Sequence, residues 1–325
     1  SSVDVTLTFS GIASTFTFHA YFEPSNQTHK ELFRPLKYSK VEVIHGGETL
    51  ITGRKLSEQF TSSSVPELTP ISGYSLSGVF EDCPPALSSY PLQFDGLSLK
   101  EIAEKLTKPF DVAIVIDSAV EAKMNAVFGT TETKPTESIA SYLTKLASQK
   151  SIILSHTSEG ALLFTEAAAN RKPIADFSNS LKRVISINGQ GLHSGVTALS
   201  EADIDAGNAG QAELNNPLVQ SFRPNVVVQS SGDDNDTELV AKKSRAAELA
   251  AIRLTIEHNS WTVNGKIIKP NNIISIQDSS IYLNKRSNWF IDSVTFKGNE
   301  SSQTSILSCV LPAVYTLEEP VDPFS

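Results

Sequence analysis

The sequence predicts a mainly β protein of several domains, with small α+β units inserted between the β regions. Stretches in which apolar and polar residues alternate fill residues 1–82 and return towards the C-terminus, whereas helical spacing is confined to the middle and one later stretch. The chain has 325 residues, which are too many for one small core. Its 40% hydrophobic and 19% charged residues are typical of a globular protein.

Residues 1–82 are predicted to form a first β domain, either a barrel or a sandwich. Apolar residues alternate with polar ones in the first strand pattern, at Val3, Val5, Leu7 and Phe9. Residues 41–53 predict a hairpin, because Gly46-Gly47 supplies the positive φ angles that a tight turn requires. The chain begins without Met and almost directly in a strand, so we expect that a leading segment was cleaved or is missing.

A small α+β unit is predicted over residues 83–127. Two consecutive prolines near its start end the strand pairing, and Ser98 and Glu101 have the spacing of a capping box, which satisfies free amides at a helix start. That helix stops at Pro109, and residues 111–117 predict a well-buried strand.

A second small α+β unit is predicted over residues 128–175. Apolar residues at helical spacing predict a helix over residues 136–149. Residues 152–156 then predict a strand, and a turn returns the chain as a second strand over 161–165, which completes a hairpin.

Residues 176–325 are predicted to form a second β domain with a long loop and a helix. A strand over 181–187 precedes a polar stretch, 188–216, which is predicted to be a long loop at an interface. An acidic turn leads into a predicted helix over 237–258. Further strands are predicted over residues 261–267, 273–277, 281–283, 289–296 and 304–311.

Charge and cysteine usage exclude several classes of function. The formal net charge of −9 and the dispersed basic residues argue against a sequence-independent nucleic-acid binder, whose affinity needs clustered Lys and Arg. Cys83 and Cys309 are far apart, which indicates two free thiols and neither a disulfide framework nor a zinc site. No apolar run approaches the roughly 18 residues that a membrane-spanning helix needs, and the N-terminus lacks the pattern of a secretory signal.

No metal site is predicted. The six histidines are interpreted as surface or hairpin residues, because none are paired four apart: His19, His29, His45, His156, His193 and His258. Residues 233–238 carry alternating oxygen ligands that could suggest calcium. However, they lack the central Gly and distal Glu of a calcium loop, so an acidic helix cap is favoured.

No catalytic or cofactor-binding residue is predicted either. Residues 189–195 offer glycines, Ser194 and His193, but match neither a phosphate loop nor a nucleophile elbow, so a flexible loop is favoured. The many Asp and Glu residues cannot be placed across a glycosidase cleft from sequence alone. Trp261 and Trp289 lie in strand patterns and are predicted to fill a core rather than to stack on a ligand.

The C-terminal half has a distinctive order of elements, which runs from Arg223-Pro224-Asn225-Val226-Val227-Val228 through an Ala-rich helix to Leu311-Pro312-Ala313-Val314-Tyr315. This order resembles that of the Mu-like baseplate hub family of contractile-tailed phages. Three segments carry the wider resemblance, and together they are moderately specific: residues 136–166, 269–276 and 289–296.

The resemblance implies two tail-tube-type β-barrels plus small α/β subdomains, of which residues 83–127 resemble a peptidoglycan-binding module. It implies a structural, non-enzymatic homotrimer whose pseudo-sixfold ring joins the tail tube protein to the central spike protein beside other baseplate proteins. By the same resemblance, the protein would need no cofactor and would let DNA pass without specific binding. It would belong to the tail baseplate of the virion, which is assembled in the host bacterial cytoplasm.

Two alternatives are kept. One is a tail-associated peptidoglycan-binding protein or lysin, in which the middle α+β unit holds the cell wall. The other is the base of a secreted spike, which would require a β-helical extension after Ser325.

Overall fold

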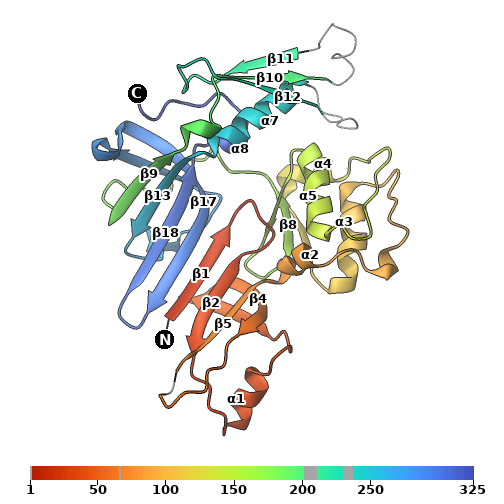
Figure 1. The fold of residues 1–325 in the computed structure, drawn as a ribbon, viewed down its shortest axis with the longest axis vertical. Coiled ribbons are helices and arrows are strands. Elements are labelled where there is room, and N and C mark those ends of the chain that lie inside the picture. The colour runs from red at the N-terminus through yellow and green to blue at the C-terminus, as the bar shows by residue number, and fades with distance from the viewer. Residues whose placement is uncertain (1, 66, 201–210, 230–236) are drawn as a thin grey trace. The chain divides into compact units, whose positions relative to one another are not determined.

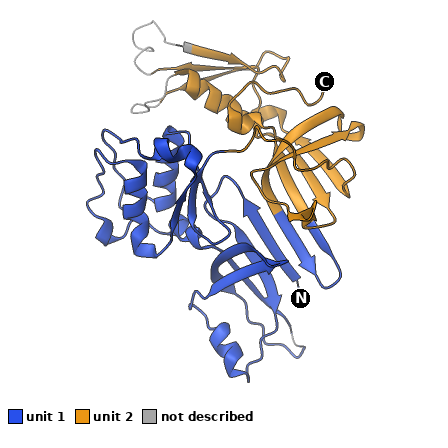
Figure 2. Cartoon of the chain, turned by 180° about the vertical axis from the view of Figure 1, so that it is seen from behind, with its two compact units in different colours: residues 1–166, 295–304 blue, residues 167–294, 305–325 orange. Residues whose placement is uncertain are grey.

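The structure is a computed structural model that describes residues 2–65, 67–200, 211–229 and 237–325. The chain divides into two compact units, unit 1 with residues 1–166 and 295–304, and unit 2 with residues 167–294 and 305–325 (Figure 2). Antiparallel sheets dominate both units, and helices are inserted between the strands (Figure 1). The predicted class, mainly β with α+β insertions, is confirmed.

The first sheet of unit 1 has the antiparallel order β3-β4-β5-β2-β1. Its strands are β1 (Ser2–Thr8), β2 (Thr15–Ala20), β3 (Lys40–His45), β4 (Glu48–Glu58) and β5 (Thr69–Ser75). The predicted hairpin is confirmed, because β3 and β4 are joined by Gly46 and Gly47, whose φ angles are 58° and 83°. Phe16 is buried against Gly53 and Gly73, where any side chain would collide with its ring and with the facing backbone.

Between β2 and β3 the chain leaves the sheet and forms the short helix α1 (Gln27–Leu32). The Asn26 side chain caps this helix by accepting hydrogen bonds from two backbone N–H groups of its first turn. The Phe22 ring lies 5.4 Å from that of Phe33 and 5.0 Å from that of Phe60. This aromatic cluster holds residues 21–39, which we call the α1 lobe.

Residues 79–165 form an α+β module within unit 1. Its elements are α2 (Val79–Asp82), α3 (Leu99–Thr107), β6 (Ile114–Ile116), α4 (Glu121–Met124), α5 (Ile139–Gln149), β7 (Ile153–His156) and β8 (Leu162–Thr165). The predicted capping box is present, with Ser98 and Glu101 each accepting a hydrogen bond from the backbone N–H of the other. One core joins apolar side chains from both predicted segments, 83–127 and 128–175, so the two pack as a single body.

The predicted well-buried strand over 111–117 is wrong in length and in burial. The observed strand β6 is three residues long, and Val115 at its centre is 41% exposed. Among the described strands β6 pairs only with β8, in the order β6-β8-β7, so it is an edge strand with one side open. The hairpin predicted for β7 and β8 is confirmed.

The main sheet of unit 2 runs in the order β17-β18-β13-β9, and β16 pairs with β17. Its strands are β9 (Lys182–Ile187), β13 (Ile252–His258), β16 (Ile273–Asp278), β17 (Leu283–Asn299) and β18 (Gln303–Val310), beside the small hairpin of β14 (Thr262–Val263) and β15 (Lys266–Ile267). Trp261 and Trp289 are buried, as predicted. The tips of β17 and β18, residues 295–304, belong to unit 1, where the Thr295 hydroxyl lies 3.0 Å from that of Thr6.

A smaller sheet in unit 2 has the order β11-β10-β12 and is covered by one helix (Figure 1). Its elements are β10 (Gly195–Leu199), β11 (Gln211–Asn215), β12 (Pro224–Val228) and α7 (Thr237–Leu249), and α8 (Ala313–Thr316) follows near the C-terminus. Ala241 of α7 packs on Val196 and Ala198 of β10, and these small side chains bring the helix close to the sheet.

Two predictions for this region are wrong. The stretch 188–216 is not a long loop, because it contributes β10 and β11. The helix predicted over 237–258 ends at Leu249, and β13 follows, because Ile252, Leu254 and Ile256 are buried at the alternating spacing of a strand. The acidic turn 233–236 lies outside the described residues.

Candidate assembly interfaces

Among the described residues, the strands at the two ends of the long sheets are β3 in unit 1 and β9 in unit 2, and each is paired on one side only. An unpaired edge presents free backbone N–H and C=O groups to any strand that approaches it. On β9, Val184 is 38% exposed and Ile187 is 52% exposed. Apolar side chains on an open edge are typical of a surface that is covered in an assembly.

The smaller sheet of unit 2 also has an open edge with exposed apolar side chains. Strand β12 pairs with β10 in parallel and with no other described strand. Val226 and Val228 are exposed on one face of β12, while Val227 packs inward against the cluster under α7. This strand belongs to the stretch that resembles the hub family, so the resemblance and the open edge coincide.

Arg223 holds the start of β12 against the turn that precedes β10. Its backbone N–H donates to the Ser194 hydroxyl at 2.8 Å, and its carbonyl accepts from the Ser194 N–H at 2.8 Å. Its guanidinium donates to the carbonyls of Leu192 at 3.0 Å and Gln190 at 3.2 Å. The predicted flexible loop over 189–195 is wrong in this respect, because residues 189–191 form one helical turn and Gly195 begins β10.

A single carboxylate, that of Glu248 on α7, joins this turn to β12. Its oxygens accept hydrogen bonds from the His193 N–H at 3.1 Å and from the Asn225 amide at 2.8 Å, and His193 Nδ1 lies 2.9 Å away. These donors come from positions far apart in the sequence, and no motif marked them. The Glu248 carboxylate thereby fixes the position of β12 against α7 and the turn at His193.

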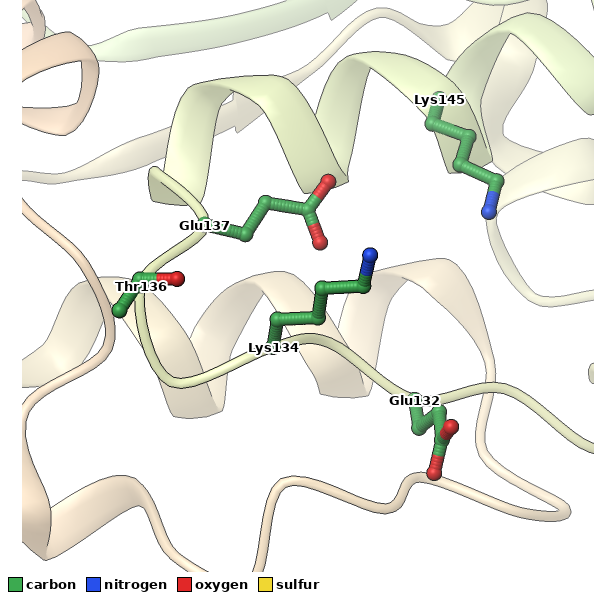
Figure 3. A pocket seen from close by; sticks show the side chains of 5 residues that line it. All are labelled: Glu132, Lys134, Thr136, Glu137 and Lys145. Carbon is green, nitrogen blue, oxygen red and sulfur yellow. The ribbon is translucent and has the colours of Figure 1, made fainter.

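A surface pocket of about 450 Å³ lies in the α+β module. It is lined by Glu132, Lys134, Thr136, Glu137 and Lys145 (Figure 3). Figure 3 shows the Lys134 ammonium and the Glu137 carboxylate reaching into the same space. The Glu137 carboxylate accepts hydrogen bonds from the hydroxyls of Thr133 at 3.0 Å and Ser141 at 3.2 Å, which hold it in place. Such a mixture of charges offers hydrogen bonds to a polar ligand.

The remaining candidates from the sequence are structural. His156 lies in β7 and makes a 3.1 Å hydrogen bond with the Gly11 carbonyl, and burial lowers its pKa. Among the described residues, no group of three or more His, Cys, Asp or Glu side chains is placed to hold a metal ion. Cys309 is buried and Cys83 is half-buried, and both are free thiols. No helix within the described residues combines the length and the apolar character needed to cross a bilayer.

Comparison with known proteins gives these features a context. Residues 78–166 match the family model described as baseplate hub protein gp44-like, second domain. Among curated proteins, none matches the sequence. The chain is similar to a 43 kDa tail protein of prophage MuSo2 from Shewanella oneidensis, at 18% identity and a TM-score of 0.78, over 97% of this chain and 94% of that chain.

Two further solved structures are similar. A tail protein from Neisseria meningitidis is 21% identical with a TM-score of 0.77, over 97% of this chain and 93% of that chain. An E. coli component of the type VI secretion system is 10% identical with a TM-score of 0.54, over 99% of this chain and 73% of that chain. The resemblance predicted from the sequence is confirmed: residues 78–166 match a baseplate hub domain model, and the chain has the fold of these phage tail proteins.

Proposed function

We propose that this protein is the structural hub of a contractile phage tail baseplate and that it acts as a homotrimer. The match of residues 78–166 to the hub model carries the proposal, and a tail-protein fold over 97% of the chain supports it. Three subunits with two tail-tube-type barrels each would present a pseudo-sixfold ring, which can meet a sixfold tube on one side and a threefold spike on the other.

The open strand edges supply a physical means of closing such a ring. Among the described strands, β3 of unit 1 and β9 of unit 2 each have an unpaired edge. Contacts between different surfaces of identical subunits form a ring when the rotation between neighbours closes. Lateral pairing of the two barrels would cover Val184 and Ile187 and satisfy the free backbone groups of β9.

The hub role implies a specific set of partners. The tail tube protein would bind one rim of the ring, the central spike protein the other, and further baseplate proteins its outside. The mechanism is architectural: the ring would serve as a template for the first tube ring and would leave a lumen for DNA or ejected proteins. The protein would then be found in the baseplate of the virion, after assembly in the host bacterial cytoplasm.

The native mass of the purified protein tests the proposal. Light scattering at several concentrations is expected to give a species near three times 35.1 kDa. Images of that species by electron microscopy should show a closed ring with pseudo-sixfold features. A strict monomer at every concentration, which still fails to assemble when tube or spike protein is added, would contradict the trimeric hub.

A second candidate function is peptidoglycan binding by the α+β module, and the polar pocket at Glu137 favours it. Sedimentation with purified sacculi tests this function directly. A hub needs no such affinity, so we expect the protein to stay in the supernatant. Retention that is lost in the variant Lys134→Ala/Glu137→Ala, but kept in the surface variant Lys108→Ala, would favour the module as a cell-wall binder.

A further inference from the structure

We propose that the α1 lobe of one subunit binds the acidic C-terminal segment of the next subunit, head to tail. The C-terminal segment is defined here as residues 317–322. The inference rests on the proposed ring for its arrangement. The contact itself is argued from the charges and exposed apolar groups of this chain.

The α1 lobe is a basic region in an acidic protein. Residues 21–39 carry three basic side chains, Lys30, Arg34 and Lys37, and two acidic ones, whereas the whole chain has a formal net charge of −9. Lys37 lies 3.9 Å from Glu31, so part of this charge is neutralised locally. Within the described part of the chain, no ion pair engages the exposed side chains of Lys30 and Arg34. These two cations are available to an acidic partner.

The lobe also holds apolar side chains out into solvent. Leu36 is 81% exposed and Tyr38 is exposed beside it. Both have left-handed backbones, with φ angles of 59° and 51°, which cost free energy in residues other than glycine. A strained backbone that displays apolar side chains to water is typical of a binding surface.

Two neighbouring residues of β4 hold the loop in this form. The buried Lys55 ammonium donates to the Arg34 carbonyl at 3.1 Å and pairs with the buried Glu58 carboxylate at 3.3 Å. The Arg54 guanidinium donates to the Tyr38 carbonyl at 3.2 Å. Because these hydrogen bonds from β4 fix the loop, its exposed face is preorganised for a partner.

The C-terminal segment has the complementary chemistry. From residue 311 to 325 there are three acidic side chains and no basic one. Val321 is 85% exposed between acidic neighbours, while Pro320 is buried and anchors the segment to unit 2. The Arg245 guanidinium donates to the Leu317 carbonyl at 3.4 Å and holds the start of the segment on α7. The described residues form no ion pair with Glu318 or Glu319.

The two surfaces match in charge and in apolar content. Lys30 and Arg34 would meet Glu318 and Glu319, while Leu36 and Val321 would bury each other. All of these side chains are exposed in the single chain, so the match is available to a second copy. Because the lobe belongs to unit 1 and the segment to unit 2, every subunit carries one of each, as a head-to-tail ring requires.

A charge swap in the full-length chain tests the contact. The variants Lys30→Glu/Arg34→Glu and Glu318→Lys/Glu319→Lys should each raise the dissociation constant of the assembly by about tenfold or more in sedimentation experiments. The combined fourfold variant restores the net charge of the parent chain and should restore association. The control Lys108→Glu/Lys172→Glu makes the same charge change on exposed residues outside the lobe and should have little effect.

Cross-linking gives a readout that does not depend on a stable trimer. Equal amounts of light and ¹⁵N-labelled protein are mixed and treated with a carbodiimide, which joins lysine amines to neighbouring carboxylates. Mass spectrometry is expected to find mixed-isotope pairs between a lobe peptide with Lys30 or Lys37 and a C-terminal peptide with Glu318 or Glu319.

The combinations of results separate this contact from the ring. A trimer that lacks these cross-links and ignores the charge reversals would keep the hub and overturn the contact. Cross-links of the lobe only to carboxylates outside residues 317–322 would overturn the contact as well. A monomer with mixed-isotope lobe-to-tail pairs would support the contact and contradict the trimer. A monomer without them would contradict both.

Discussion

At the scale of single residues, the carboxylate of Glu248 on α7 holds the smaller sheet of unit 2 in place. This carboxylate accepts hydrogen bonds from His193 and Asn225, so removing it leaves half-buried donors without partners. We expect Glu248→Ala to lower the free energy of unfolding by about 2–4 kcal/mol in urea titrations. Glu238→Ala on the same helix removes only an exposed pair with Lys242 at 2.6 Å and should cost less than about 0.5 kcal/mol. Equal losses in both variants would contradict the role of Glu248.

His156 predicts a dependence of stability on pH. Burial lowers its pKa, and the hydrogen bond with the Gly11 carbonyl opposes that shift only in part. The folded state therefore binds fewer protons than the unfolded state once the pH falls below the ordinary histidine pKa of about 6.5. This contribution to stability is complete above that pH and is lost as the pH falls towards the lowered pKa.

The variant His156→Asn tests this prediction, because the amide can still donate to Gly11 but does not titrate. Melting temperatures are measured between pH 5 and pH 8 for both proteins. The parent should lose more stability than the variant on the acid side, by at most about 1.4 kcal/mol per pH unit for one proton. Parallel curves would show that His156 does not contribute. His258 has a pKa that burial lowers too, and it remains in both proteins.

At the scale of elements, β9 is the edge strand that the proposed ring would cover. We expect Val184→Lys/Ile187→Lys to abolish association while leaving the melting temperature within a few degrees of the parent, because both side chains are exposed in the single chain. Leu87→Lys replaces a still more exposed apolar residue in the α+β module and serves as the control. Loss of association in both variants would point to nonspecific hydrophobic contact instead.

The sequence correctly predicted those elements that are determined by residues close together in the chain. The Gly46-Gly47 hairpin and the Ser98 capping box are examples, because their determinants lie within a few residues. Residues 252–258 were mistaken for helix because an Ala-rich run precedes them, although Ile252, Leu254 and Ile256 alternate as a strand requires. Strand β10 was missed because it is short and its partner β12 follows only after β11.

The candidate interfaces could be predicted less well than the fold. The Glu248 constellation joins residues that are 55 and 23 positions apart, and no spacing rule links them. Open edges are visible only once the strand order is known, since β9 and β3 have the same alternating pattern as a paired strand. The sequence shows the charges of the acidic C-terminal segment and of the residues around Arg34. Their exposure became known only from the structure.

At the scale of the whole molecule, the net charge of −9 sets how the protein meets DNA. We expect no retention of duplex DNA in mobility-shift experiments at about 150 mM salt, because phosphate binding needs clustered cations that release counterions. If the subunits close the proposed ring, such a surface would let DNA pass through its lumen without sticking. Binding at this salt concentration with a steep salt dependence would reveal a basic channel and contradict the prediction.

The exposed cations of the α1 lobe allow a second test of DNA binding. In low salt the exposed Lys30 and Arg34 could hold DNA weakly on a subunit that is not assembled. If the acidic segment of a neighbour covers them, that weak binding should appear only in dissociated protein and should vanish on assembly. We therefore expect the dissociated variant Val184→Lys/Ile187→Lys to shift DNA in low salt, and the addition of Lys30→Glu/Arg34→Glu to abolish the shift. Equal binding by assembled and dissociated protein would place the lobe outside the subunit contact.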